Sequence, residues 1–249
     1  MIRKALCLCL ICFSVVANEI SHIAVASNMS HAANELIKAF LYKHPNTQIR
    51  PTLGSSGKLT AQIKNGANYS LFLSADMKYP LALHADAQTI LPPQAYAYGK
   101  LALFSAQKRD LSKGIFALQN PNISKIALSN PRTAPYGTAG IEVLTKTKLL
   151  PKLKPKLVYA ESIAQSLSYA QVATDFGLVA LSLLHSPKMK KYTQGTHWVE
   201  INQTLYSPIK QGVALLKHAK NDENVQAFYE FLFTKEAQAI FRKYGYETP

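Results

Sequence analysis

The chain has 249 residues, of which 48% are hydrophobic and 17% charged, with 11 glycines and 13 prolines. This composition is typical of a globular protein and excludes fibrous and disordered chains, and the length is enough for two lobes. Lysine and arginine outnumber aspartate and glutamate by 28 to 14, which gives a formal net charge of +14. Such a charge favours anionic partners by long-range attraction but does not identify the anion.

The N-terminal residues have the pattern of a signal peptide, which we place at residues 1–17. Two cations, Arg3 and Lys4, precede an apolar run, and Ala17 provides a small residue for cleavage. The run of about 12 apolar residues is short of the roughly 20 that a membrane-spanning helix needs. We therefore expect cleavage near Ala17, export to the periplasm and a mature chain that begins at Asn18.

The cysteines give no chemistry to the mature chain. All three, Cys7, Cys9 and Cys12, lie within the predicted signal peptide. The mature chain therefore has no thiol for a disulfide, a metal site or nucleophilic catalysis. Lipidation is not expected, because Leu8 and Ile11 stand where a lipoprotein has a small residue before its modified cysteine.

Strands alternate with helices in the first part of the mature chain. A β-branched run at residues 20–27 precedes apolar positions at helical spacing that end before Pro45. An extended segment ending at Gly54 and a second helix repeat this unit, and a strand at 69–76 with a helix at 78–87 completes the third. This order predicts the α/β class with a parallel sheet.

The rest of the chain continues in the same way and predicts a second lobe. Strands are expected at 99–106, 123–131, 175–182 and 207–216, and helices at 139–150, 161–174 and 224–244. A new unit begins near residue 99, while the last strand and helix are expected to return to the first lobe. We assign residues 18–98 and 206–249 to lobe I and residues 99–205 to lobe II, joined by two crossing strands.

Several classes of site are not indicated by the sequence. No two of the seven histidines are three or four residues apart, and neither HExxH nor CxxC occurs, so no metal site is expected. The segment 54–58 (GSSGK) differs from a phosphate loop in its spacing, and Leu59 replaces the hydroxyl residue that would hold magnesium. The lysines of 146–156 and 188–191 are not interleaved with aromatic residues, so no nucleic acid is expected.

Hydroxyl and small residues stand at several turns that are predicted to open helices. These turns contain Ser27-Asn28, Gly54-Ser55-Ser56-Gly57, Pro135-Tyr136-Gly137 and Ser162-Ile163. The first N–H groups of a helix have no internal acceptor and carry the positive end of the helix dipole, so several converging N-termini would bind an oxyanion. Ordinary helix capping explains each turn taken singly. It is their combination that points to an oxyanion site.

Six segments resemble, in the same order, the exported molybdate-binding proteins, which are the solute receptors of an ATP-driven oxyanion importer. They are IAVASNMSHAANELIKAF (23–40), LGSSGKLTAQIKNGANYSLFLSAD (53–76), YAYGKLALFS (96–105), IALSNPRTAPYGTAGIEVL (126–144), DFGLVALS (175–182) and AFYEFLFTKEAQAIFRKYGY (227–246). The resemblance covers nearly the whole mature chain.

The resemblance implies a two-lobed periplasmic-binding-protein type II fold whose interlobe cleft captures molybdate or tungstate. The protein would be a monomeric receptor without enzymatic activity or cofactor, and it would deliver the anion to the membrane permease of an ABC importer. No metal would be coordinated directly, because hydrogen bonds would hold the metal-oxo anion. The implied ligand-binding residues are Ser27, Asn28, Ser55 and Ser56 as hydroxyl and N–H donors, with Tyr136 and Ile163 as main-chain donors.

Some family members place a tyrosine hydroxyl on the ligand from the strand that matches residues 177–182, whereas this chain has Ala180 there. Glu161 is the one carboxylate near the predicted turns, and we expect it to face water.

Other functions remain open from the residues alone. A receptor for sulfate or thiosulfate would use the same kind of site, and only the cavity radius would discriminate between the anions. A ferric-iron receptor is less well supported, because no two of the 13 tyrosines are adjacent. An exported serine hydrolase would use Ser27 or Ser56 as nucleophile with His31 or His197 as base.

Overall fold

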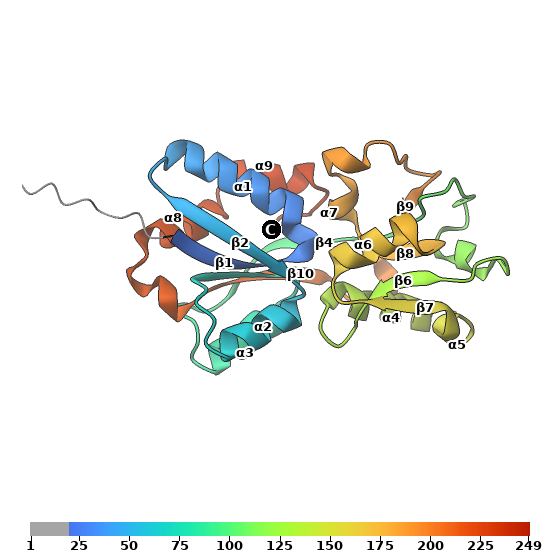
Figure 1. Ribbon diagram of the computed structural model, residues 1–249, viewed down its shortest axis with the longest axis horizontal. Helices are drawn as coiled ribbons and strands as arrows, with labels where there is room; N and C mark the ends of the chain where they lie inside the picture. Colours follow the sequence, from blue (N-terminus) through green and yellow to red (C-terminus); the bar gives the residue numbers. More distant parts are fainter. Residues whose placement is uncertain (1–19) are drawn as a thin grey trace, which may run out of the picture.

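The computed structural model describes residues 20–249, so the predicted signal peptide lies outside the described residues. Two β-sheets lie side by side along the long axis of the molecule, each with helices on its faces (Figure 1). The first sheet takes strands from both ends of the chain and the second takes strands from the middle. We call the first sheet with its helices lobe I and the second sheet with its helices lobe II. The predicted α/β class is confirmed.

The sheet of lobe I has five strands in the order β2-β1-β3-β10-β4. Their bounds are β1 (Ile20–Ala26), β2 (Gln48–Gly54), β3 (Leu71–Ser74), β4 (Gln94–Gly99) and β10 (Ile209–Leu215). β1 is parallel to β2 and β3, as the alternation of strands and helices predicts. β10 is antiparallel to β3 and β4, because the chain enters it from lobe II at the opposite end of the sheet. The sheet is therefore mixed rather than parallel.

Helices cover both faces of this sheet. They are α1 (Ser30–Lys43), α2 (Ser56–Lys64), α3 (Lys78–Ala85), α8 (Glu223–Phe231) and α9 (Lys235–Lys243). α1, α8 and α9 share one apolar core, while α2 and α3 pack over a smaller core on the opposite face (Figure 1).

The single helix predicted at 224–244 is wrong, because α8 and α9 are separate helices. Thr234 stands between them as the N-cap of α9, and its Oγ1 accepts a hydrogen bond from the N–H of Ala237 at 3.2 Å. The same hydroxyl donates to the carbonyl of Phe231 at 2.8 Å. These local bonds end one helix and start the next, although the apolar periodicity runs through both.

The sheet of lobe II has the order β7-β6-β8-β5-β9. Its strands are β5 (Leu101–Phe104), β6 (Ile126–Ser129), β7 (Leu157–Ala160), β8 (Phe176–Ala180) and β9 (Trp198–Glu200). Its helices are α4 (Pro135–Lys146), α5 (Leu150–Leu153), α6 (Ile163–Val172) and α7 (Leu181–Leu184). The helix predicted at 139–150 begins four residues earlier, at Pro135, because proline is favoured in the first helical turn.

Two passages of the chain connect the lobes. β4 ends at Gly99 and β5 begins at Leu101 on the way out, and the chain returns into β10 at Ile209. The C-terminal segment then lies beside β4, since Tyr98 and Glu247 exchange main-chain hydrogen bonds of 2.7 and 3.0 Å. This pairing brings the end of the chain close to the junction between the lobes.

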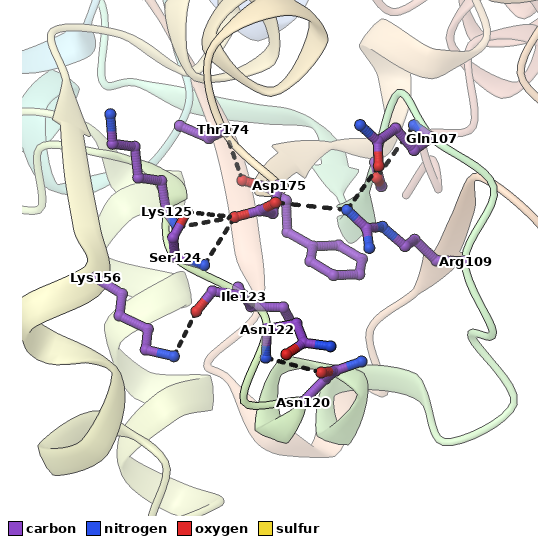
Figure 2. A network of polar contacts seen from close by, with 12 residues as sticks. Gln107, Arg109, Asn120, Asn122, Ile123, Ser124, Lys125, Lys156, Thr174 and Asp175 are labelled. Carbon is purple, nitrogen blue, oxygen red and sulfur yellow. Dashed lines mark hydrogen bonds and ion pairs between the residues drawn. The ribbon is translucent and has the colours of Figure 1, made fainter.

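A polar network at the far end of lobe II ties the starts of two strands together (Figure 2). The Asp175 carboxylate accepts hydrogen bonds from the N–H groups of Ser124 and Lys125 at 2.8 and 3.0 Å, and Arg109 lies 3.5 Å away. Burial alone would raise the pKa of this carboxyl, but these bonds and the Arg109 charge lower it overall. The Arg109 guanidinium also lies 5.6 Å from the centre of the Phe176 ring. The network therefore stabilises the scaffold away from the cleft.

Within residues 20–249, none of the helices is long and apolar enough to span a membrane.

Candidate functional site

The carboxyl ends of the parallel strands of the two lobes face each other across a small cavity. In lobe I, Ala26 at the end of β1 is in register with Gly54 at the end of β2. In lobe II, Ser129 at the end of β6 is in register with Ala160 at the end of β7. Open α/β sheets bind ligands outside the carboxyl ends of their strands, so this is where a ligand is expected.

All six predicted binding residues line this cavity. Its lining consists of Ala26, Ser27, Asn28, Gly54, Ser55, Ser56, Ala75, Ala134, Pro135, Tyr136 and Ile163, around an empty volume of about 180 Å³. Each of the six is at most 4% exposed. None of the lining side chains carries a formal charge, so the cavity is a neutral space between the lobes.

Helix starts form the wall on the lobe I side. β1 leads directly into a short 3-10 helix, Ser27–Met29, which continues as α1. β2 ends at Gly54, and Ser55 is the N-cap of α2. Because the first N–H groups of a helix lack acceptors within the helix, both starts direct main-chain donors at the cavity.

Two helix starts of lobe II complete the wall. α4 begins at Pro135 and α6 begins at Ile163. Ser162 is the N-cap of α6, and its hydroxyl oxygen accepts a hydrogen bond from the N–H of Gln165 at 3.3 Å. The main-chain N–H groups of Tyr136 and Ile163 have no acceptor among residues 20–249. The dipoles of these helices add partial positive charge on the same side.

Gly137 allows the start of α4 to approach β6 closely. A Cβ at this position would lie 2.1 Å from the carbonyl oxygen of Ser129, so only glycine fits. The close approach fixes the position of Tyr136, the next residue back in the chain, at the cavity wall.

The serine hydroxyls are oriented as donors. The Ser56 Oγ accepts the N–H of Ala75 at 2.9 Å, and the Ser27 Oγ accepts the N–H of Ala164 from the other lobe at 3.4 Å. Each hydroxyl hydrogen therefore remains available to an anion. The Ser55 hydroxyl is buried and has no partner in the described part of the chain. The arrangement gives three hydroxyl donors in one neutral cavity.

The side chain of Asn28, in contrast, is already occupied. Its Nδ2 donates to the Oε1 of Gln211 and to the hydroxyl of Tyr246, both at 2.8 Å. Its main-chain carbonyl accepts hydrogen bonds from the hydroxyls of Ser182 at 2.9 Å and Tyr246 at 3.0 Å. Asn28 can therefore serve the cavity through its main-chain N–H and not through its amide nitrogen.

The tyrosines around the cavity are neutral donors. Burial, followed by the neighbouring tyrosines Tyr246, Tyr96 and Tyr206, raises the pKa of Tyr136 well above its usual value, and only the Asn28 side chain lowers it. Burial raises the pKa of Tyr246 in the same way. Neither phenol adds a negative charge near the site in ordinary buffers.

The two lobes touch each other at the rim of the cavity. The N–H of Gly57 donates to the carbonyl of Thr133 at 2.8 Å, and the Lys58 ammonium forms an ion pair with Glu161. Glu161 is exposed, as expected, and its side chain retains 57% of its accessible surface. It therefore lies outside the cavity rather than within it.

A neighbouring interlobe groove is larger but has the wrong charge for an anion. It has an empty volume of about 570 Å³, and its lining includes two carboxylates, those of Asp76 and Glu142, against one cation, Lys78. Burial raises the pKa of Asp76, against the opposing hydrogen bonds from Tyr79 and Ser74. Carboxylates facing the groove disfavour a second negative charge, so the neutral cavity is the better anion site.

Ala180 lies at the end of β8, is fully buried and does not line the cavity. The tyrosine hydroxyl that some family members place on the ligand therefore has no counterpart from this position. The hydroxyl of Ser55, which has no partner among the described residues, is a further donor beside those of Ser27 and Ser56.

The geometry does not favour a serine hydrolase or a metal centre. No histidine of the described chain lines the cavity, and the Nδ1 of His197 contacts Thr193 instead. Among residues 20–249, no group of three or more His, Cys, Asp or Glu side chains is placed to hold a metal ion.

Comparisons with known proteins agree with this architecture. A family model described as bacterial extracellular solute-binding protein matches residues 22–247. The chain is 36% identical over 228 residues to the molybdate-binding protein ModA of Rhodobacter capsulatus, covering 90% of this chain and 87% of that protein.

Solved structures give the same result. The periplasmic molybdate-binding protein of Azotobacter vinelandii superposes with a TM-score of 0.84 at 33% identity, over 92% of this chain and 99% of that one. The sulfate-binding protein SubI of Mycobacterium tuberculosis superposes with a TM-score of 0.73 at 14% identity, over 92% of this chain and 86% of that one, which shows the fold alone. The chain therefore belongs to the family of bacterial extracellular solute-binding proteins and is a relative of its molybdate-binding members.

Proposed function

We propose that the protein binds molybdate or tungstate in the cavity between its lobes and delivers the anion to the membrane permease of an ABC importer from the periplasm. The observation that carries this proposal is a neutral cavity lined by hydrogen-bond donors from both lobes. The molybdate-binding relatives, which share 33–36% of their residues with this chain, support the choice of anion.

Uncharged donors suffice to hold a dianion. The hydroxyls of Ser27, Ser55 and Ser56 and the main-chain N–H groups of Tyr136 and Ile163 supply five donors. A hydrogen bond to a charged acceptor contributes about 1.5–3 kcal/mol, so five of them offset much of the loss of hydration. The positive ends of the helix dipoles at the cavity contribute in the same direction.

A cavity whose serine hydroxyls and main-chain N–H groups all donate also selects the protonation state of its ligand. Molybdate and tungstate carry no proton near neutral pH, whereas phosphate carries a P–OH group that needs an acceptor. A P–OH placed against buried donors leaves one of them unpaired, which costs about 1–3 kcal/mol. The site is therefore expected to discriminate against phosphate on hydrogen bonding alone.

The interlobe contacts indicate how binding would be signalled. An anion that bonds to Ser56 and Tyr136 at the same time stabilises the closed arrangement, in which Gly57 meets Thr133. The differential affinity for the closed state would shift a hinge equilibrium, and the permease would recognise the closed shape. The receptor itself, acting as a monomer, would carry out no chemistry.

Titration calorimetry of the mature protein tests the proposal. We expect tight binding of molybdate and tungstate with one anion per chain, and weak competition by phosphate. Sulfate and thiosulfate, which also present unprotonated oxygens, are the competitors that measure size selection. The absence of binding heat with both molybdate and tungstate would refute the proposal, and preferential binding of sulfate would reassign the ligand.

A further inference from the structure

We propose that Gly99 is a positioning residue of the anion site. Because it has no side chain, the phenol of Tyr136 can rest on the chain where it crosses between the lobes, and this contact sets how closely lobe II approaches lobe I. The inference rests on the proposed function and deepens it. Gly99 does not line the cavity, so it acts on the anion only through Tyr136.

Gly99 lies where the two passages of the chain between the lobes run side by side. It is the last residue of β4, and β5 of lobe II begins two residues later, at Leu101. In the sheet of lobe I it is in register with Ile209, the first residue of β10 on the returning passage. Hinges are a few residues in loops or at the ends of elements that absorb the change in main-chain dihedral angles, and Gly99 has this placement.

The Tyr136 phenol occupies the space that a side chain at position 99 would need. A Cβ on Gly99 would lie 2.1 Å from the Tyr136 hydroxyl oxygen and 3.0 Å from the Cζ of the same ring. The hydroxyl has no hydrogen-bond partner among residues 20–249, so packing and not a hydrogen bond holds the ring at this place. Because Tyr136 is only 1% exposed, the ring cannot turn aside into solvent.

Tyr136 belongs to lobe II but reaches both the cavity and the hinge. Its main-chain N–H lies at the cavity wall without an acceptor in the described part of the chain. Its side chain belongs to the apolar core of lobe II, and this core includes Ala26 and Ala75 from the strand ends of lobe I. In such a closely packed core the ring cannot yield alone, so a displaced phenol would draw the Tyr136 N–H away from an anion bound to the serines of lobe I.

A methyl group at position 99 would therefore oppose closure of the cleft. The contact with Tyr136 lies between the lobes, so opening of the cleft relieves it. Within lobe I the added Cβ would lie 2.9 Å from the Nε2 of Gln211, which is the end of a side chain and can shift slightly. We expect the hinge equilibrium to move toward the open arrangement, which lowers the apparent affinity for an anion that requires closure.

The test measures tungstate dissociation constants by titration calorimetry in the wild type, Gly99→Ala, Tyr136→Phe and the double variant. Gly99→Ala should weaken tungstate binding by at least about tenfold, as expected for an overpacked contact. Tyr136→Phe removes the oxygen that lies 2.1 Å from the added Cβ, so the loss caused by Gly99→Ala should be at least about fivefold smaller in that background. A main chain that is merely stiffer at position 99 would weaken binding equally in both backgrounds.

Gly177→Ala is the matched control for overpacking at a buried strand glycine. Its added Cβ on β8 would lie 2.6 Å from the Cβ of Ala170, which belongs to the same lobe. Any loss of tungstate affinity that this control causes should be the same in the wild-type and Tyr136→Phe backgrounds. Thermal unfolding without ligand shows which of the variants are folded.

The outcomes are distinct. A wild-type protein that does not bind tungstate would refute the proposed function. Tungstate binding by the wild type together with an unchanged affinity in Gly99→Ala, or with an equal loss in the two backgrounds, would overturn the inference alone. A Gly99→Ala variant that does not fold would also overturn it, because opening of the lobes would then not relieve the contact.

Discussion

Gly57 of lobe I and Thr133 of lobe II meet across the cleft, with the N–H of Gly57 donating to the carbonyl oxygen of Thr133 at 2.8 Å. A Cβ on Gly57 would lie 2.9 Å from the Thr133 Cα and 3.0 Å from its carbonyl oxygen. Both are main-chain atoms of lobe II and cannot move aside by a side-chain rotation. The two lobes would therefore have to move apart.

Gly57→Ala should therefore impair closure of the cleft, while within lobe I only the flexible end of the Tyr79 side chain, 2.7 Å from the added Cβ, has to move. We expect tungstate affinity to fall about tenfold or more, because overpacking of this kind costs about 1–3 kcal/mol. The melting temperature without ligand should be unchanged or slightly higher, since alanine favours a helix over glycine. Calorimetry and thermal unfolding measure the two effects, and unchanged affinity would mean that the lobes do not meet at Gly57 in the bound state.

Ser56→Ala should weaken tungstate binding by roughly one to two powers of ten. The change removes a hydroxyl that is held by the N–H of Ala75 and is free to donate to the anion. Ser105→Ala is the matched control, because Ser105 is equally buried and its hydroxyl accepts only the N–H of Gln107 in lobe II. Equal affinities of the wild type and Ser56→Ala would remove Ser56 from the site.

The ion pair between Lys58 and Glu161 at the rim should contribute little. Both side chains are more than half exposed, and exposed pairs contribute about 0.2–1 kcal/mol. We expect Glu161→Gln to change tungstate affinity less than about fivefold at low salt and not at all in high salt. A large effect that survives in high salt would show that Glu161 acts within the site and not at its rim.

The buried tyrosines should make the protein sensitive to alkaline pH. Burial raises the pKa of Tyr96, Tyr136 and Tyr246 above the usual 10.0, so the native state retains protons that the unfolded state releases. Stability from these groups is complete below about pH 10 and is lost as the pH rises further, by up to about 1.4 kcal/mol per pH unit for each tyrosine.

Urea unfolding at pH 9, 10 and 11 measures this loss. The free energy of unfolding should decline more steeply above pH 10 in the wild type than in Tyr246→Phe, which lacks one of the three phenols. Parallel curves for the two proteins would show that Tyr246 ionises equally in the native and unfolded states.

Local patterns in the sequence were sufficient to predict the fold class and to gather the residues of the cavity. Ser27 and Ser56 each follow a strand and open a helix, and the carboxyl ends of neighbouring strands necessarily meet at one edge of a sheet. The turn at Tyr136 could be placed in the same way. The direction of β10 could not be predicted in this way. It depends on the path of the chain through lobe II, and the alternation of strands and helices does not determine that path.

Contacts between residues that are far apart along the chain could not be predicted from the sequence. Asn28 is held by Ser182, Gln211 and Tyr246, which are 154, 183 and 218 residues away along the chain. None of the three stands in a turn that was predicted to open a helix at the site, so no local signal marks them as partners of Asn28. The short edge strands β7 and β9 were missed because they are partly exposed, whereas the equally short strands β3, β5 and β6 are fully buried and stand out in the sequence as apolar runs.

A crystal structure of the mature protein grown with tungstate, with the metal located by its anomalous scattering, tests the central claim most directly. We predict one tungstate in the cavity, with its oxygens within hydrogen-bond distance of the Ser27 and Ser56 hydroxyls and of the Tyr136 and Ile163 main-chain nitrogens. A tungstate bound elsewhere, or held in the cleft by a lysine or arginine side chain, would contradict the account.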